Sequence, residues 1–234
     1  VVSALGGLLF GFDTAVIAGT TASLRELFDL SDWQMGFAVS SALIGTILGT
    51  LVFTRPADLW GRRDSLKVLA SLFFISALGS ALAAEFWSLV VFRLIGGLGV
   101  GGASVLGPMY AAEISPARIR GRMVILFQYN ACVGMLLAFF SNALIQTLGL
   151  DALQLEWRLM FAAECIPALL FFILLFLIPR SPRWLVSRER FADAEGVLAL
   201  VGEENIPAEM EEIKRSLHVS EHRTRDRLFQ RKYA

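Results

Sequence analysis

The sequence predicts an all-α membrane protein, and two observations support this fold class. Of the 234 residues, 56% are hydrophobic and only 18% are charged, whereas a soluble domain usually has about 25% charged residues. The hydrophobic residues gather in six long blocks, each close to the roughly 20 residues that a helix needs to cross a bilayer. The net charge is zero, so nothing points to a nucleic-acid partner.

The six blocks are the expected membrane-spanning helices. They cover about 1–20, 35–53, 66–84, 86–112, 123–148 and 157–178. The polar segments between them include an acidic loop at 23–32, a charged loop at 54–67, a basic segment at 113–122 and a short loop with Asp151 and Glu156. Glycines four residues apart, such as Gly7 with Gly11 and Gly45 with Gly49, allow helices to approach closely in a membrane.

The fourth block carries an unexpected charge. Arg93 lies near its start and is followed by six glycines, and we expect the helix to break at Pro108. A charge inside a membrane span is a functional-site hypothesis by default. Asp13 in the first block and Glu164 in the sixth are the other ionisable residues well inside the apolar blocks, and they can partly neutralise Arg93.

The composition changes after Ile178, which divides the chain into a six-span bundle at 1–178 and a polar segment at 179–234. Apolar stripes beginning at Phe191 and Ile206 predict two amphipathic helices in the polar segment. Basic residues concentrate in this segment and in the loops after the second and fourth blocks. The positive-inside rule therefore places these segments and both chain ends in the cytoplasm.

Paired glycines open both the first and the fourth blocks, as Gly6 with Gly7 and as Gly96 with Gly97. A basic loop containing Gly-Arg follows the second block and also the fourth. Repeats of three spans with inverted topology are a feature of secondary transporters. We therefore expect a three-plus-three inverted repeat.

Several motifs, in this order, resemble one transporter family. They are LGGLLFGFDTAVIAGT at 5–20, the pattern of Asp58, Gly61, Arg62 and Arg63, PMYAAEISPARIRGR at 108–122, WRLMFAAECIPALLFF at 157–172 and PRSPRWL at 179–185. Together they resemble the sugar porter family of the major facilitator superfamily, and bacterial proton-coupled sugar and polyol symporters in particular. The sequence departs from the family pattern at Thr54, at Leu59 and at Arg180, where the family usually has glycine, a basic residue and glutamate.

The resemblance implies a major facilitator fold, which has twelve spans in two halves. The chain would form the amino-terminal half with its cytoplasmic helices, and RDRLFQRKYA at 225–234 resembles the segment before the seventh span. We expect the missing carboxyl-terminal half and the lipid bilayer of the cell membrane as its partners.

The resemblance also implies roles for the buried charges. Asp13 would be the proton-binding carboxylate, Arg93 its partner and Glu164 a modulator of the pair; the alternative is a static ion pair that fixes helix packing. Gln128 and Phe10 would contact the sugar. Their alternatives are an amide bonded to a neighbouring helix and an aromatic ring in lipid or core packing.

A set of cytoplasmic residues resembles the charge network that closes the inner gate of this family. Its members here are Asp58, Gly61, Arg62, Arg63, Glu113, Arg120, Arg180 and Arg183. A generic positive-inside loop would explain the arginines but not Asp58 and Glu113. Because Arg180 replaces an acid, we predict a weakened or rewired network.

The predicted function is secondary active transport: proton-coupled symport of a monosaccharide or polyol by alternating access. A transporter-like nutrient sensor and an inactive fragment without the second half are the alternatives. We expect no enzyme activity, no metal and no cofactor beyond the coupling proton. The GxGxxG pattern at Gly97, Gly99 and Gly102 lies inside an apolar helix and lacks the strand and the acid of a dinucleotide site.

Overall fold

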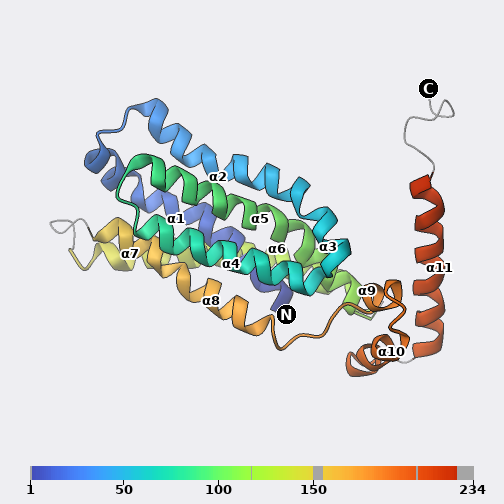
Figure 1. Cartoon of the computed structure of the whole chain (residues 1–234). Helices are drawn as coiled ribbons and strands as arrows, with labels where there is room; N and C mark the ends of the chain where they lie inside the picture. The colour runs from blue at the N-terminus through green and yellow to red at the C-terminus, as the bar shows by residue number, and fades with distance from the viewer. Residues whose placement is uncertain (1, 117, 150–154, 204, 226–234) are drawn as a thin grey trace.

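The structure is a computed structural model that describes residues 2–116, 118–149, 155–203 and 205–225, and this part of the chain is helical without strands. A 3₁₀ turn η1 (Val2–Ala4) leads into α1 (Leu5–Phe28), α2 (Asp32–Val52), α3 (Thr54–Trp60), α4 (Arg62–Ala81), α5 (Phe86–Ile114), α6 (Arg120–Gln146), α7 (Glu156–Ala163), α8 (Cys165–Leu174), α9 (Pro182–Ser187), α10 (Phe191–Leu200) and α11 (Ile206–Arg225). Long helices form a bundle, and α9 to α11 lie at one end of it (Figure 1).

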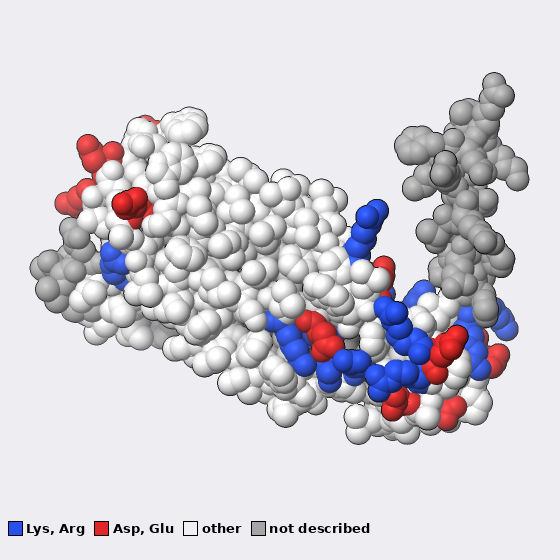
Figure 2. Space-filling view, in the orientation of Figure 1, with Lys and Arg blue, Asp and Glu red and all other residues white. Residues whose placement is uncertain are grey.

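The six predicted spans are present. Among the described residues, six helices are long and apolar enough to cross a membrane: α1, α2, α4, α5, α6 and the combined α7–α8. The flank of the bundle in Figure 2 is almost free of charged side chains, which gather at its two ends. This distribution matches a hydrocarbon layer bounded by two polar surfaces.

The predicted acidic loop at 23–32 is wrong in most of its length. Helix α1 continues to Phe28, and only Asp29 to Ser31 connect it to α2. Asp29 has a left-handed backbone with φ 48°, and Ser31 forms a capping box with Gln34 at the start of α2. The apolar pattern ends at the edge of the membrane, but polar residues extend the helix beyond it.

The charged loop at 54–67 is also mostly helical. It contains α3 and the first turn of α4, and Gly61 alone separates the two helices. Gly61 has φ +91°, which side chains other than glycine rarely adopt, and a Cβ there would lie 3.1 Å from the indole ring of Trp184. Glycine at position 61 therefore permits both the sharp turn and the close contact with α9.

Proline effects differ from the prediction in α5 and in the sixth span. Helix α5 runs through Pro108 to Ile114, and α6 already begins at Arg120, so the loop between them is shorter than expected. Packing of α5 against α1, α2, α4 and α6 outweighs the loss of one helical hydrogen bond at Pro108. The sixth span is instead interrupted at Glu164, three residues before Pro167, whose ring crowds the carbonyl four residues earlier.

Two helix pairs are held together by glycines at backbone contact distance. A Cβ at Gly97 of α5 would overlap the carbonyl oxygen of Ala42 and crowd Gly45 of α2. A Cβ at Gly11 of α1 would likewise overlap the carbonyl oxygen of Ala131 of α6. As expected from the glycine spacing, the helices approach until their backbones touch.

The two close pairs fit the predicted repeat. The α1–α6 pair joins the first and fifth spans, and the α2–α5 pair joins the second and fourth. In such a repeat, the first span corresponds to the fourth and the second to the fifth. The pair of the first and fifth spans therefore corresponds to the pair of the fourth and second spans. A three-plus-three repeat requires this equivalence.

The segment after α8 forms its own small core. Trp184, Leu185 and Val186 of α9 are buried with one residue pair from each following helix, Ala194 with Leu198 and Met210 with Ile213. The two predicted amphipathic helices are therefore confirmed as α10 and α11, whereas α9 was not predicted. The division at 178/179 stays a prediction, and Asp151 and residues 226–234 lie outside the described residues.

Candidate functional site

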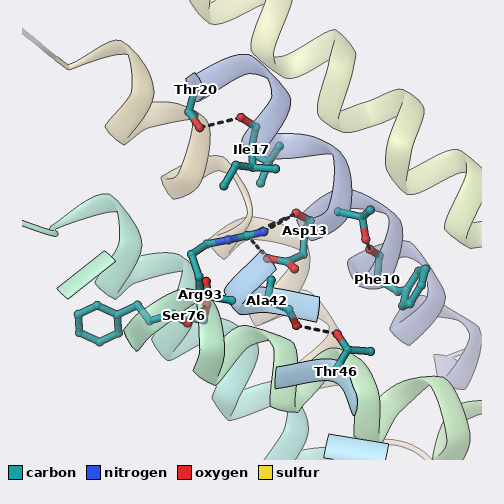
Figure 3. A network of polar contacts seen from close by, with 12 residues as sticks. Phe10, Asp13, Ile17, Thr20, Ala42, Thr46, Ser76 and Arg93 are labelled. Carbon is teal, nitrogen blue, oxygen red and sulfur yellow. Dashed lines mark hydrogen bonds and ion pairs between the residues drawn. The ribbon is translucent and has the colours of Figure 1, made fainter. Parts of the chain in front are cut away.

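A buried ion pair joins the first and fourth spans. Arg93 Nη1 of α5 lies 2.5 Å from Asp13 Oδ1 of α1, and the two side chains are only 2% and 5% exposed. The same guanidinium also donates to the backbone carbonyl of Asp13 through Nη1 and Nη2, each at 3.4 Å (Figure 3). A charge this deeply buried must be paired, because removing it from water alone costs several kcal/mol.

The surroundings of the pair are contributed by α4, α5 and α7. Ser76 of α4 donates to the carbonyl of Phe92 at 2.7 Å, which ties α4 to the turn that carries Arg93. A Cβ at Gly96 would overlap Ser76 Oγ, so glycine lets α5 approach α4 closely beside the ion pair. The ring of Phe161 lies 5.8 Å from the guanidinium carbon.

Glu164 is the third ionisable residue at this site. It is 3% exposed, lies at the junction of α7 and α8, and interacts electrostatically with both Asp13 and Arg93. Arg93 Nε is buried and makes no hydrogen bond within the described chain. The structure therefore assembles the three predicted residues from three different spans, with Asp13 as the direct partner of Arg93.

The two predicted sugar-contact residues come from the closely packed α1 and α6. Gln128 is exposed on α6, and it follows Phe127, whose carbonyl faces Gly7 of α1. Phe10 lies on α1, one turn before Asp13, and is half-buried against an apolar cluster that includes Leu9. Gln128 thus has an accessible amide, while the Phe10 ring takes part in core packing.

The predicted gate residues separate into distinct networks. In the first, Arg62 Nε lies 3.1 Å from Glu113 Oε1, an ion pair without hydrogen-bond alignment, and Arg62 Nη2 lies 3.0 Å from Asp58 Oδ1. Glu113 Oε2 also accepts a hydrogen bond from Ser181 Oγ at 2.5 Å, and Ser181 caps α9. This network holds the ends of α4, α5 and α9 together.

The second network is centred on Asp64 in the first turn of α4. Arg180 Nη2 lies 2.8 Å from Asp64 Oδ2, while Arg63 Nε and Lys67 Nζ each lie 3.3 Å from Oδ1. Arg63 also donates to the carbonyl of Ile178 at 3.2 Å. Arg180 is therefore paired within this half of the fold.

The remaining gate residues take other positions. Arg120 Nη2 of α6 lies 3.6 Å from Glu209 Oε1 of α11, so its acidic partner comes from the last described helix and not from α5. Arg183 is half-buried at the start of α9 and has no ion pair within the described part of the chain. Within that same part, no group of three or more His, Cys, Asp or Glu residues could hold a metal ion.

This arrangement agrees with the comparison to known proteins. A family model described as "Sugar (and other) transporter" matches residues 1–233. The chain belongs to this sugar transporter family. This family member therefore contains a buried ion pair between α1 and α5, helices packed through glycines, and polar networks at one end of the bundle.

Two relatives and one solved structure illustrate the similarity. The chain is 46% identical to the D-xylose-proton symporter of Escherichia coli K12, over 92% of this chain and 50% of that protein. It is 40% identical to the major myo-inositol transporter IolT of Bacillus subtilis, over 91% of this chain and 46% of that protein. A partially occluded, inward-open structure of the xylose transporter XylE from E. coli superimposes with a TM-score of 0.87 at 44% identity, covering 93% of this chain and 56% of that one. The chain spans about half the length of the curated relatives it matches.

Sequence reasoning missed several partners in this sugar transporter fold. Ser181 could have been found, because serine before Pro182 is a signal for a helix N-terminus. Asp64 and Glu209 gave no such signal, since each looks like an ordinary acid on a charged helix. Their roles depend on segments that are distant in the sequence, namely Arg180 for Asp64 and Arg120 for Glu209.

Proposed function

We propose that this chain is the amino-terminal half of a proton-coupled symporter for a monosaccharide or polyol. The observation that supports this most strongly is the buried pair of Asp13 and Arg93 with Glu164 beside it. The proton symporter and the inositol transporter among its relatives have names that fit this substrate class and this coupling ion. The proposed activity is transport and involves no chemical conversion of the sugar.

The charges provide a physical route to proton coupling. When Asp13 is ionised, it neutralises Arg93 and holds α1 against α5. When a proton binds Asp13, Arg93 loses its counter-charge, and Glu164 is the other acid that interacts with it. Because an unpaired buried charge is strongly unfavourable, protonation would favour a rearrangement of the helices that carry these residues. This rearrangement is the proposed link between proton binding and alternating access.

Substrate would bind between this half and a second half. Discontinuous helices and a midplane site are features of transporters built from repeats, and the interruption of the sixth span lies at Glu164. We assign the exposed amide of Gln128 to the sugar, since an amide can donate to and accept from neighbouring hydroxyls. Phe10 is assigned a supporting role at the edge of the same site.

The proposal also includes an orientation in the membrane and a role for the two polar networks. Both ends of the chain and the two polar networks lie in the cytoplasm of a cell membrane, as the basic loops indicate. The networks around Glu113 and Asp64 would stabilise the state that is closed on the inside. Figure 1 supports placing the start of α1 and helices α9 to α11 on the same side of the membrane, because they are at the same end of the bundle.

The test uses the full-length transporter that carries this chain, expressed in cells and supplied with labelled xylose, glucose, arabinose and myo-inositol. Asp13→Asn should abolish accumulation against a gradient while exchange of the same sugar across the membrane persists. Asp32→Asn is the matched control, because Asp32 is exposed and pairs with Arg25 outside the bundle core. Undiminished accumulation by Asp13→Asn would overturn the coupling role, and failure of wild type with every sugar would overturn the substrate class.

A further inference from the structure

Three cations surround a single carboxylate at the start of α4. Arg63, Lys67 and Arg180 all lie within 3.3 Å of an Asp64 oxygen. Glu113, the acid of the neighbouring network, is already engaged by Arg62 and Ser181. The Asp64 network therefore keeps an excess of positive charge. In Figure 2 a band of basic side chains crosses the end of the bundle, with acidic side chains beside it at several points.

The same cations lie against aromatic and apolar surface. Lys67 Nζ is 4.1 Å from the centre of the Phe176 ring, and the guanidinium of Arg180 is 4.8 Å from the Trp184 ring. Phe176 and the neighbouring Leu177 are 57% and 76% exposed, at the end of the sixth span. A cation beside exposed apolar side chains at the end of a span is placed at the depth of lipid headgroups.

We propose that Lys67 and Arg180 bind the phosphate of an anionic phospholipid, whose acyl chains lie along Phe176 and Leu177. The side chains of Lys67 and Arg180 are 19% and 33% exposed, so they are anchored by Asp64 yet remain accessible. Basic pockets between spanning helices on the cytoplasmic side are known to hold anionic headgroups. Arg180 is essential, because with an acid at position 180 the network would contain two cations and two acids.

A lipid explains the cluster better than a soluble phosphate compound does. The basic groups adjoin exposed side chains of α8 and the residues just after it, and Ile173, one turn before Leu177, is 53% exposed as well. This apolar surface would contact the hydrocarbon chains of a lipid in a membrane. It would make no favourable contact with a soluble anion. The proposal is independent of the transported substrate and of proton coupling.

The experiment titrates the purified full-length protein with three probes and detects bound molecules by native mass spectrometry. The probes are phosphatidylglycerol, phosphatidylcholine with the same acyl chains, and glycerol 3-phosphate. Wild type should prefer phosphatidylglycerol over both others. Lys67→Gln combined with Arg180→Gln should weaken phosphatidylglycerol binding about 30-fold, as expected for two basic residues near a charged lipid, and leave phosphatidylcholine binding unchanged.

The matched control removes two charges from α11. Lys214→Gln combined with Arg215→Gln should bind phosphatidylglycerol like wild type, since both residues lie on α11 and Lys214 pairs there with Glu211, whereas Asp64 pairs with Arg63, Lys67 and Arg180. Arg180→Lys, which keeps the charge, should retain most of the binding and guards against a variant that fails to fold. Equal binding of the two lipids, unchanged binding by the Lys67/Arg180 double variant, or equally tight glycerol 3-phosphate binding would each overturn the proposal.

Discussion

Asp13 and Arg93 are 80 positions apart in the sequence, yet Arg93 Nη1 lies 2.5 Å from Asp13 Oδ1 in the interior of the bundle. This pair connects the first and fourth spans, which are equivalent in the three-plus-three repeat. The contact therefore links the two repeats at the point where their charges must be neutralised. Its loss should affect both the stability and the proposed coupling.

Arg93→Gln should destabilise the protein by about 3–5 kcal/mol, because it leaves a buried carboxylate without its cation. Adding Asp13→Asn to this variant should restore part of the stability, since neither charge is then present. Thermal unfolding of the purified full-length protein, compared across the two single variants and the double variant, measures this coupling. Additive effects of the two substitutions would show that the side chains do not interact.

Gly97→Ala should destabilise the α2–α5 pair by about 1–3 kcal/mol, because the added methyl group would overlap the backbone of Ala42. Gly36→Ala is the matched control on α2, since no atom lies within 4 Å of a Cβ at that position. This control should be neutral or stabilising by up to about 1 kcal/mol, as expected for alanine in a helix. Equal melting temperatures of the two variants would contradict the close packing.

Arg62→Gln should destabilise the protein by about 3 kcal/mol, since both Arg62 and Glu113 are 11% exposed and Glu113 would lose its cation. Arg55→Gln serves as the comparison, because Arg55 is exposed in the same charged segment and should change stability by no more than about 0.5 kcal/mol. Urea or thermal unfolding in detergent separates the two cases. A similar small effect of both variants would assign Arg62 to a generic basic loop.

The contact between α6 and α11 should depend on pH through Glu209. Burial raises the pKa of Glu209, the neighbouring acids Glu212 and Glu203 raise it further, and Arg120 lowers it in part. The folded segment therefore binds a proton more tightly than the unfolded segment, and stability increases as pH falls from neutral through the raised pKa.

Amide hydrogen exchange in α11, corrected for its intrinsic pH dependence, should therefore indicate less opening at pH 5 than at pH 7. Glu209→Gln should remove most of this difference, because glutamine does not titrate. Glu211→Gln is the matched control on the same helix, where Lys214 lowers the pKa of Glu211. Greater opening at pH 5 in wild type would contradict the sign of this effect.

Much of the bundle could be predicted because its signals are local. Long apolar blocks identify the spans, and isolated charges such as Asp13, Arg93 and Glu164 stand out against them. The ends of the helices were harder to predict than the spans, since α1 extends to Phe28 through polar residues that the apolar pattern does not include. Proline gave opposite results in two helices: α5 is continuous at Pro108, whereas the sixth span is interrupted before Pro167.

The polar networks could be predicted only in part. Sequence motifs identified Arg62, Arg63 and Glu113, but the pairing of Arg120 with Glu209 requires α11 to lie beside α6. The pairing of Arg180 with Asp64 depends in the same way on how the chain turns after α8. Tertiary placement decides which acid each arginine meets, and a single sequence does not encode that choice in a local pattern.

Sugar-driven proton movement tests the central proposal most directly. The full-length transporter is reconstituted in liposomes that contain a pH-sensitive dye, and a transported sugar is added outside without an imposed proton gradient. We predict acidification of the interior by wild type and by Asp32→Asn, and none by Asp13→Asn, although Asp13→Asn still exchanges labelled sugar. Equal acidification by wild type and Asp13→Asn would contradict the role of Asp13 as the proton-binding residue.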